Sequence, residues 1–329
     1  MTQTATPSDY TRLIDSQTHA FIQRTEAAYP ENAATLDIQQ QRALYDDMCH
    51  EFHAGYPAGV ISHDTFVAST DGGPIPTRRY EPPARIRADD AAQIIYVHGG
   101  GFVVGGLSSH DDVCAEICAR TGLALTAVDY RLSPEHKHPA ALDDTMKVID
   151  VVSQFHQQPI VLCGDSAGAN LAAAACHAYR ARAASMQIIP KLIGQVLIYP
   201  GLGGDTLQGS YLTHAMSPML TTEDVHFYSN ARCASDTDVL DPLFAPLQDI
   251  DFSDLPPTVV FSAECDPLCD DGEHYCQHIR LAEGKAHWVL ERGLVHGYLR
   301  ARHSVDRAAR SFDRMIEAIV SMTEHRWPY

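Results

Sequence analysis

One serine lies in a context typical of an activated nucleophile. The segment GDSAG at residues 164–168 matches the pattern G-x-S-x-G, with an apolar run before it and an alanine-rich run after it. These flanks predict a sharp turn from a strand into a helix, where glycines avoid clashes and the helix N-terminus favours negative charge. The pentapeptide alone also fits a tight turn with a solvent-facing serine. The strand and helix around it favour Ser166 as a nucleophile that attacks a carbonyl.

A run of three glycines could supply the backbone hydrogen-bond donors that such an attack on a carbonyl needs. The segment HGGGF at residues 98–102 follows an apolar run. Successive glycines let backbone N–H groups point at a ligand, and with the Ala167 N–H they could stabilise a tetrahedral oxyanion. A plain flexible turn is the alternative. Dinucleotide binding does not fit, because Val104 occupies the last glycine position of G-x-G-x-x-G, and a P-loop fails because Leu107 follows Gly106.

A nucleophilic serine needs a base, and the base needs a carboxylate that orients it. Of the 18 histidines, His296 has the most suitable context, a short loop after an apolar strand and before a helix. Asp266 follows another apolar strand, and the carboxyl ends of parallel strands meet at one sheet edge. The order Ser, Asp, His is the one expected in an α/β-hydrolase. Asp270 and Asp271 lie close by in sequence and remain alternatives for the acid.

Taken together, these motifs resemble those of the hormone-sensitive-lipase family of α/β-hydrolase esterases. The matching stretches are HGGGF (98–102), DYRLSPEH (129–136), GDSAG (164–168), DPL (266–268) and HGY (296–298). The resemblance implies an α/β fold with a mostly parallel eight-stranded sheet flanked by helices. It also implies a catalytic triad of Ser166, Asp266 and His296, with Gly100, Gly101 and Ala167 as oxyanion donors. Cys269 and the pair at residues 137–138 depart from the family's usual residues.

The elements that must position these groups follow from periodicity. Apolar strands alternate with helices from residue 93 onward, which predicts a parallel sheet covered on both faces. Residues 8–55 read as helical, and residues 63–80 as two strands around a turn at 71–74, followed by a surface loop over 81–91. Later strands are expected at 93–98, 123–130, 159–164, 191–200, 258–263 and 286–291, and helices at 110–121, 140–154, 167–184 and 306–325.

The polar segment 203–235 interrupts this alternation and could form a lid. The resemblance implies a cap built from this insertion and from the N-terminal helices. The sequence thus predicts an N-terminal cap segment at 1–55, a catalytic core at 56–202 and 236–329, and a cap insertion at 203–235.

Composition limits the partners. The chain has 329 residues, 45% of them hydrophobic, and a formal net charge of −18, which disfavours binding to nucleic acid. No stretch is long and apolar enough to span a bilayer, no secretory signal is apparent, and the nine cysteines have no C-x-x-C spacing, so a cytoplasmic location is expected. His136 and His138 have no evident third partner for a metal, and neither a metal nor a cofactor is expected.

The expected reaction is hydrolysis of a small-molecule ester through an acyl-enzyme. The resemblance implies short acyl chains, from acetyl to hexanoyl, and a homodimer as one assembly option. Cleavage of amides or lactones uses the same triad, and only the pocket would distinguish it. A binding protein on the same scaffold is a further alternative, although the retention of Ser166, Asp266 and His296 favours catalysis.

Overall fold

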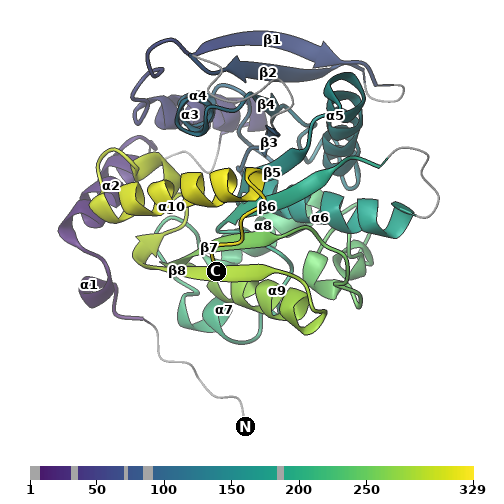
Figure 1. Ribbon diagram of the computed structural model, residues 1–329. Coiled ribbons are helices and arrows are strands. Elements are labelled where there is room, and N and C mark those ends of the chain that lie inside the picture. The colour runs from purple at the N-terminus through teal and green to yellow at the C-terminus, as the bar shows by residue number, and fades with distance from the viewer. Residues whose placement is uncertain (1–7, 31–35, 70–72, 84–91, 184–188) are drawn as a thin grey trace.

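An eight-stranded sheet runs through the centre of the protein in the computed structural model, which describes residues 8–30, 36–69, 73–83, 92–183 and 189–329 (Figure 1). The strand order is β1-β2-β4-β3-β5-β6-β7-β8. The strands are β1 (Ile61–Val67), β2 (Ile75–Glu81), β3 (Gln93–Val97), β4 (Leu125–Val128), β5 (Ile160–Asp165), β6 (Leu192–Ile198), β7 (Thr258–Cys265) and β8 (Ala286–Val295). The pairings from β4 to β8 are parallel, whereas β1–β2 and β2–β4 are antiparallel.

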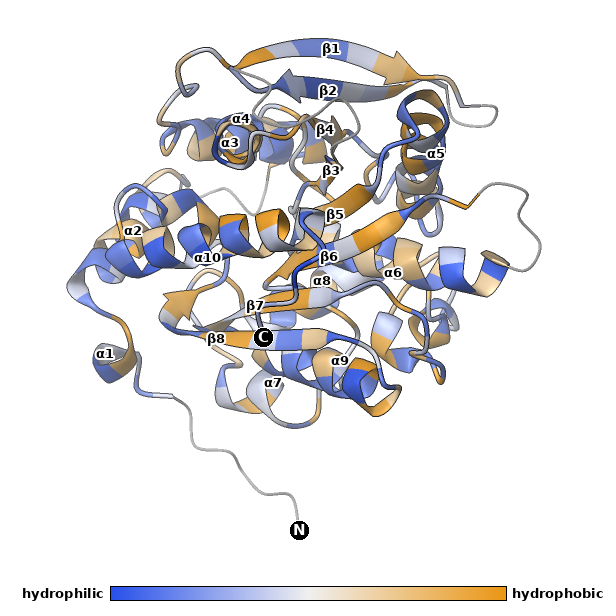
Figure 2. Ribbon diagram, viewed as in Figure 1, coloured by the Kyte–Doolittle hydropathy of each residue, from blue (hydrophilic) through white to orange (hydrophobic). Residues whose placement is uncertain are grey.

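Helices cover both faces of the sheet. The helices are α1 (Tyr10–Leu13), α2 (Ser16–Ala27), α3 (Ile38–His50), α4 (Asp111–Thr121), α5 (Ala140–His156), α6 (Ala167–Arg182), α7 (Ser210–Thr213), α8 (Thr222–Arg232), α9 (Cys269–Leu281) and α10 (Asp306–Thr323). One apolar cluster joins the sheet to α2, α3, α4 and α10, and a second joins it to α5, α6 and α9. Every residue of β3, β4 and β5 is buried, because these central strands have apolar layers on both faces (Figure 2).

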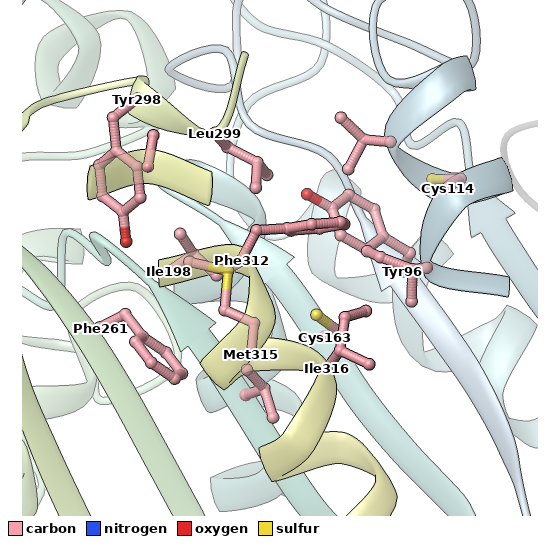
Figure 3. Packing of buried hydrophobic residues seen from close by; sticks show 14 of the residues in the cluster. Tyr96, Cys114, Cys163, Ile198, Phe261, Tyr298, Leu299, Phe312, Met315 and Ile316 are labelled. Atoms are coloured by element: carbon pink, nitrogen blue, oxygen red, sulfur yellow. The ribbon is translucent and has the colours of Figure 1, made fainter. Parts of the chain in front are cut away.

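Helix α10 shows how sequence periodicity builds one of these layers. Its buried side chains recur at spacings of three and four residues, among them Phe312, Met315, Ile319 and Met322. Figure 3 shows Phe312 and Met315 among Tyr96, Ile198 and Phe261 of the sheet. The opposite face of the helix carries charged residues. This amphipathic helix therefore closes the core that holds β5, the strand leading to Ser166.

The predicted alternation of strands and helices is confirmed, with most boundaries within a few residues. β8 extends to Val295 and α5 to His156, beyond the predicted ends. The N-terminal region is helical as expected, and β1 and β2 are the two strands predicted there, which pair antiparallel. Parts of the predicted turn at 71–74, of the loop at 81–91 and of the helix end at 184 lie outside the described residues. Helix α9, between β7 and β8, was not predicted.

Candidate active site

Ser166 occupies the turn between β5 and α6, with the strained backbone that its motif requires. Its φ is 52° and its ψ is −117°, a left-handed conformation that is rare for a residue with a side chain. The flanking glycines make the turn feasible. A Cβ on Gly168 would lie 2.0 Å from the Val97 carbonyl oxygen, and one on Gly164 would lie 2.7 Å from the carbonyl of Gly168. Close packing of the turn against β3 therefore fixes the position of the serine hydroxyl.

His296 and Asp266 meet Ser166 at the carboxyl edge of the sheet. The Nε2 atom of His296 lies 2.9 Å from Ser166 Oγ, and its Nδ1 lies 2.7 Å from Asp266 Oδ2. An ionised carboxylate only accepts hydrogen bonds, so Nδ1 donates to Asp266 and Nε2 is left as an acceptor facing the Ser166 hydroxyl. The three residues follow β5, β8 and β7, which explains how side chains 130 positions apart come together.

The two neighbouring aspartates have other partners. Asp270 accepts a hydrogen bond from the Ser210 N–H at 2.8 Å, at the start of α7. Asp271 accepts from the Leu202 N–H at 2.7 Å and from the Tyr211 hydroxyl at 3.1 Å. Asp266 is completely buried, and its second oxygen accepts from the Leu268 N–H at 2.9 Å. Of the three carboxylates that the sequence left open, only Asp266 is bonded to His296.

The glycine loop has backbone angles that only glycine adopts easily. Gly100 has a φ of 122° and Gly101 a φ of 60°. A Cβ on Gly100 would lie 2.1 Å from the Val104 carbonyl oxygen, and one on Gly101 would lie 2.3 Å from the ring of Tyr228 in α8. Among the described residues, neither glycine N–H donates to a protein acceptor. The loop and the first turn of α6, which begins at Ala167, border the same cavity as Ser166.

A buried carboxylate links this loop to the turn that carries Ser166, and sequence reasoning missed it. Asp165 Oδ1 accepts hydrogen bonds from the Gly99 N–H and the Tyr96 hydroxyl, each at 2.9 Å. His110 Nε2 lies 3.2 Å from the same oxygen. Burial alone would raise the pKa of Asp165, but His110 and the two hydrogen bonds hold it below its usual value. Asp165 is the variable residue of G-x-S-x-G, so its motif gave no reason to single it out.

His98 holds the same residue of the loop, Gly99, by its carbonyl group. Its Nδ1 lies 2.7 Å from the Gly99 carbonyl oxygen, and its ring stacks on Tyr130 at 4.2 Å between centroids. The Tyr130 hydroxyl donates to the His98 carbonyl oxygen at 2.9 Å. Burial lowers the pKa of His98 to about 3, so the ring stays neutral and donates from Nδ1. Gly99, at the start of the loop, is thereby held through both its carbonyl oxygen and its N–H.

A cavity of about 1040 Å³ opens over these groups. It is bordered by Ser166, His296 and the glycine loop on the sheet side. Residues of α2, α3 and α8 border it elsewhere, including Thr25, Tyr45 and Tyr228. The size and the mixture of apolar and polar walls suit an organic ligand of small to moderate size.

The remaining predictions concern metals and membranes. The described residues contain no group of three or more His, Cys, Asp or Glu side chains able to hold a metal ion. His138, one of the two histidines considered, lies 3.2 Å from Asp241 and packs against Phe244. Within the described ranges, no helix has the length and apolar character needed to cross a membrane.

Comparison with known proteins extends the resemblance over most of the chain. A family model described as the alpha/beta hydrolase fold matches residues 94–300. The chain is 30% identical over 262 residues to the ethyl acetate hydrolase of Pseudomonas putida, covering 78% of this chain and 81% of that protein. It is also 30% identical over 298 residues to the acetyl esterase of Salmonella typhi, covering 88% of each.

A solved structure supports the same relationship. The hyperthermophilic esterase of Pyrobaculum calidifontis superimposes with a TM-score of 0.84 and 28% sequence identity, covering 94% of this chain and 99% of that one. With the family model and both relatives in agreement, the chain belongs to the hormone-sensitive-lipase family of α/β-hydrolase carboxylesterases and is a carboxylic ester hydrolase.

Proposed function

We propose that the protein hydrolyses short-chain acyl esters through an acyl-enzyme, with Ser166 as nucleophile, His296 as base and Asp266 as the orienting carboxylate. The observation that carries the proposal is the chain of contacts at 2.9 Å from Ser166 to His296 and 2.7 Å from His296 to Asp266. Both distances fit direct hydrogen bonds without rearrangement.

The proposed reaction uses each of these contacts. Ser166 Oγ attacks the ester carbonyl while His296 Nε2 takes its proton, and Asp266 stabilises the imidazolium that forms. The N–H groups of Gly100, Gly101 and Ala167 donate to the oxyanion. As the tetrahedral intermediate collapses, His296 protonates the departing alcohol. Water, activated by the same imidazole, then attacks the acyl-enzyme, releasing the carboxylic acid and restoring the serine hydroxyl.

The test compares replacement of the proposed nucleophile with replacement of a control serine at another position. Ser166→Ala should reduce turnover of 4-nitrophenyl butanoate by at least about 10⁴-fold, because the bond-forming oxygen is gone. Ser108→Ala, at an exposed position away from the cavity, should leave turnover within twofold of wild type. A fluorophosphonate probe should label Ser166, as mapped by peptide mass spectrometry. Near-wild-type turnover by Ser166→Ala would refute the assignment, and a folded wild-type protein that is neither labelled nor active would indicate a binding protein.

A preference for acetyl to hexanoyl chains is part of the proposal. The names of two relatives, an ethyl acetate hydrolase and an acetyl esterase, support short acyl groups. A series of 4-nitrophenyl esters from acetyl to hexadecanoyl should give the highest kcat/KM at six carbons or fewer. A maximum at dodecanoyl or longer would contradict it.

The cap is also a proposal. Residues 1–55 and 203–235 are proposed to form it over a core of residues 56–202 and 236–329. The positions of α2, α3 and α8 at the border of the cavity support this division. Deleting the cap insertion should alter the preference for acyl-chain length, measured against the full-length protein as the reference.

Assembly and location complete the proposal. A homodimer is proposed from family resemblance, and light scattering coupled to size-exclusion chromatography at several concentrations would test it. All nine cysteines are unpaired, and eight of them are buried, which supports the reducing cytoplasm as the compartment.

A further inference from the structure

Arg232, the last residue of α8, is a buried cation at the border of the active-site cavity. Only 3% of its surface is exposed. Among the described residues, no carboxylate lies within 4 Å of its guanidinium. Arginine is rarely buried without an anionic partner, because desolvating a charge is costly. The position therefore calls for an explanation beyond ordinary packing.

The surroundings of Arg232 hold its guanidinium in one orientation. The group lies 3.9 Å from the ring centroid of Phe102 and 4.3 Å from that of Phe244. Its Nη1 donates to Asn170 Oδ1 at 3.1 Å and to the Phe244 carbonyl oxygen at 3.0 Å. Its Nη2 is buried and has no hydrogen-bond acceptor. The two N–H groups on Nη2 of this fixed, desolvated cation are thus left without an acceptor.

The charge persists at neutral pH. Burial lowers the pKa of Arg232 to about 9, in the absence of an ion-paired carboxylate, and the group still carries its proton at pH 7. An anion that entered the cavity would meet this charge in a poorly solvated setting. Attraction between opposite charges is much stronger there than in water.

Arg232 also lies close to the reacting groups. Phe102, whose ring it covers, directly follows Gly101 of the glycine loop. Asn170, which accepts its hydrogen bond, lies one helical turn after Ser166 and donates its own N–H to the Ser166 carbonyl oxygen at 3.1 Å. A substituent on a bound ester could therefore approach Arg232 while the ester carbonyl is at Ser166.

The cavity also borders three carboxylates that are not part of the triad or its network. Glu26, Asp205 and Asp224 are all exposed. Asp224 accepts from the Thr221 N–H at 2.9 Å, and Asp205 from the Leu207 N–H at 2.9 Å. Exposed charges are screened by water and salt over about 10 Å. We therefore expect the buried cation to determine the electrostatic potential inside the cavity, and the three exposed carboxylates to contribute less to it.

We propose that Arg232 is a binding site for a carboxylate on the substrate, so that the esters this protein hydrolyses include ones with a carboxylate in one half of the molecule. The inference rests on the proposed function, because it needs the ester carbonyl at Ser166. Monoesters of short dicarboxylic acids carry that charge in the acyl half, and acylated hydroxy acids carry it in the alcohol half.

Arg300 is the alternative anchor. It follows His296 by four residues and borders the same cavity, and its Nε is buried without an acceptor. Its Nη1 donates to the Tyr45 hydroxyl at 3.5 Å, a long contact. Arg232 is the stronger choice, because its guanidinium is held by two rings and two hydrogen bonds.

The experiment compares esters that differ only by a carboxylate in place of a methyl group. Monomethyl glutarate is paired with methyl pentanoate for the acyl half, and 3-acetoxypropanoate with propyl acetate for the alcohol half. Turnover is followed by pH-stat titration at pH 7.5 with the full-length protein. The readout is the ratio of kcat/KM for the charged ester to that for its neutral partner.

Wild type should give a ratio of one or more in at least one pair, and Arg232→Met should lower that ratio at least tenfold, mainly through KM. Arg232→Lys should lower it less, because the charge remains. Arg300→Met should leave the ratio within twofold. So should the matched control Arg180→Met, at a site where the arginine pairs with Asp249.

Three outcomes would overturn the inference. One is a wild-type ratio below one in both pairs, a result that needs no variant and so holds even if Arg232→Met fails to fold. The second is an unchanged ratio in folded Arg232→Met, and the third is a tenfold loss in Arg300→Met. Failure of the proposed function is recognised separately, because the neutral esters would then not be hydrolysed or their hydrolysis would survive Ser166→Ala.

Discussion

The Gly99 N–H donates a hydrogen bond of 2.9 Å to the carboxylate of Asp165, the residue immediately before the proposed nucleophile. The same carboxylate oxygen accepts from Tyr96 and lies 3.2 Å from His110. The glycine loop and the nucleophile turn therefore share one buried anion. We infer that their relative position depends on that anion and on its ionisation.

Asp165→Asn should test this dependence. The change keeps the shape but removes the charge that faces His110, and it leaves at least one buried donor without an acceptor, at a cost of about 2–4 kcal/mol. Among folded molecules, kcat should fall tenfold or more while KM changes little, because the donors and the nucleophile lose alignment. Urea unfolding and ester kinetics would measure both effects. Asp236→Asn, at an exposed site, is the control, and equal kcat values in the two variants would argue against the idea.

Asp266→Asn should separate the proposed triad acid from its neighbour in sequence. An amide at this position no longer selects the histidine tautomer with the proton on Nδ1, and kcat should fall by about 10³–10⁴-fold with the fold intact. Asp270→Asn should cost less than about fivefold, because Asp270 accepts from the Ser210 N–H rather than from His296. Steady-state kinetics with 4-nitrophenyl acetate would decide. A reversed ranking would assign the acid to Asp270.

Gly168→Ala should destabilise the nucleophile turn. The added Cβ would lie 2.0 Å from the Val97 carbonyl oxygen, so backbone must shift, at a cost of about 3 kcal/mol or more. The expected drop in Tm is roughly 5–10 °C by calorimetry. Gly55→Ala adds a Cβ that meets nothing within 4 Å. Its positive φ alone should lower the free energy of unfolding, by about 1 kcal/mol. Similar Tm values for the two variants would contradict the packing described for this turn.

Asp271 should make stability depend on pH. Burial raises its pKa from 3.8 to about 6, although Leu202 and Tyr211 donate to it. The unfolded chain releases the proton near pH 4, while the folded protein holds it until about pH 6. Stability should therefore fall as pH rises through this window and stay lower above it, by up to about 3 kcal/mol.

Asp271→Asn does not titrate, so its free energy of unfolding should lack that contribution. Urea unfolding at pH 4, 5, 6 and 7 would compare the two proteins. The stability of wild type relative to Asp271→Asn should decrease from pH 4 to pH 6. Parallel curves would show that burial does not perturb Asp271, and Asp236→Asn again provides the exposed control.

The parts of the structure that were predictable have local signatures. The strand before Ser166, the glycine loop and the loop around His296 are each readable from a few adjacent residues, and the order of the motifs predicts their convergence. Helix α9 lacks such a signature. Its buried face mixes the hydrophobic side chains of Tyr275 and Ile279 with Cys276, Asp271 and Gly272, which blurs the apolar periodicity. The glycine is needed because a Cβ there would lie 2.4 Å from Ser262 Oγ.

Contacts between distant segments were beyond the reach of the sequence. His110 and Asp165 are 55 positions apart, and neither neighbourhood indicates a partner. Arg232 lies at the end of a polar helix, where a solvated arginine is the usual expectation. Only the folded chain shows that aromatic rings from two other segments enclose it.

The contact between Tyr228 and Gly101 joins helix α8, which borders the cavity, to the backbone N–H groups proposed to stabilise the oxyanion. The ring leaves no room for even one carbon atom on that glycine. Substitutions in α8 that enlarge or reshape the entrance would thus be transmitted to the amide donors beneath it. Selectivity and turnover rate should consequently change together when this helix is altered, so that tuning one independently of the other would require substitutions elsewhere around the cavity.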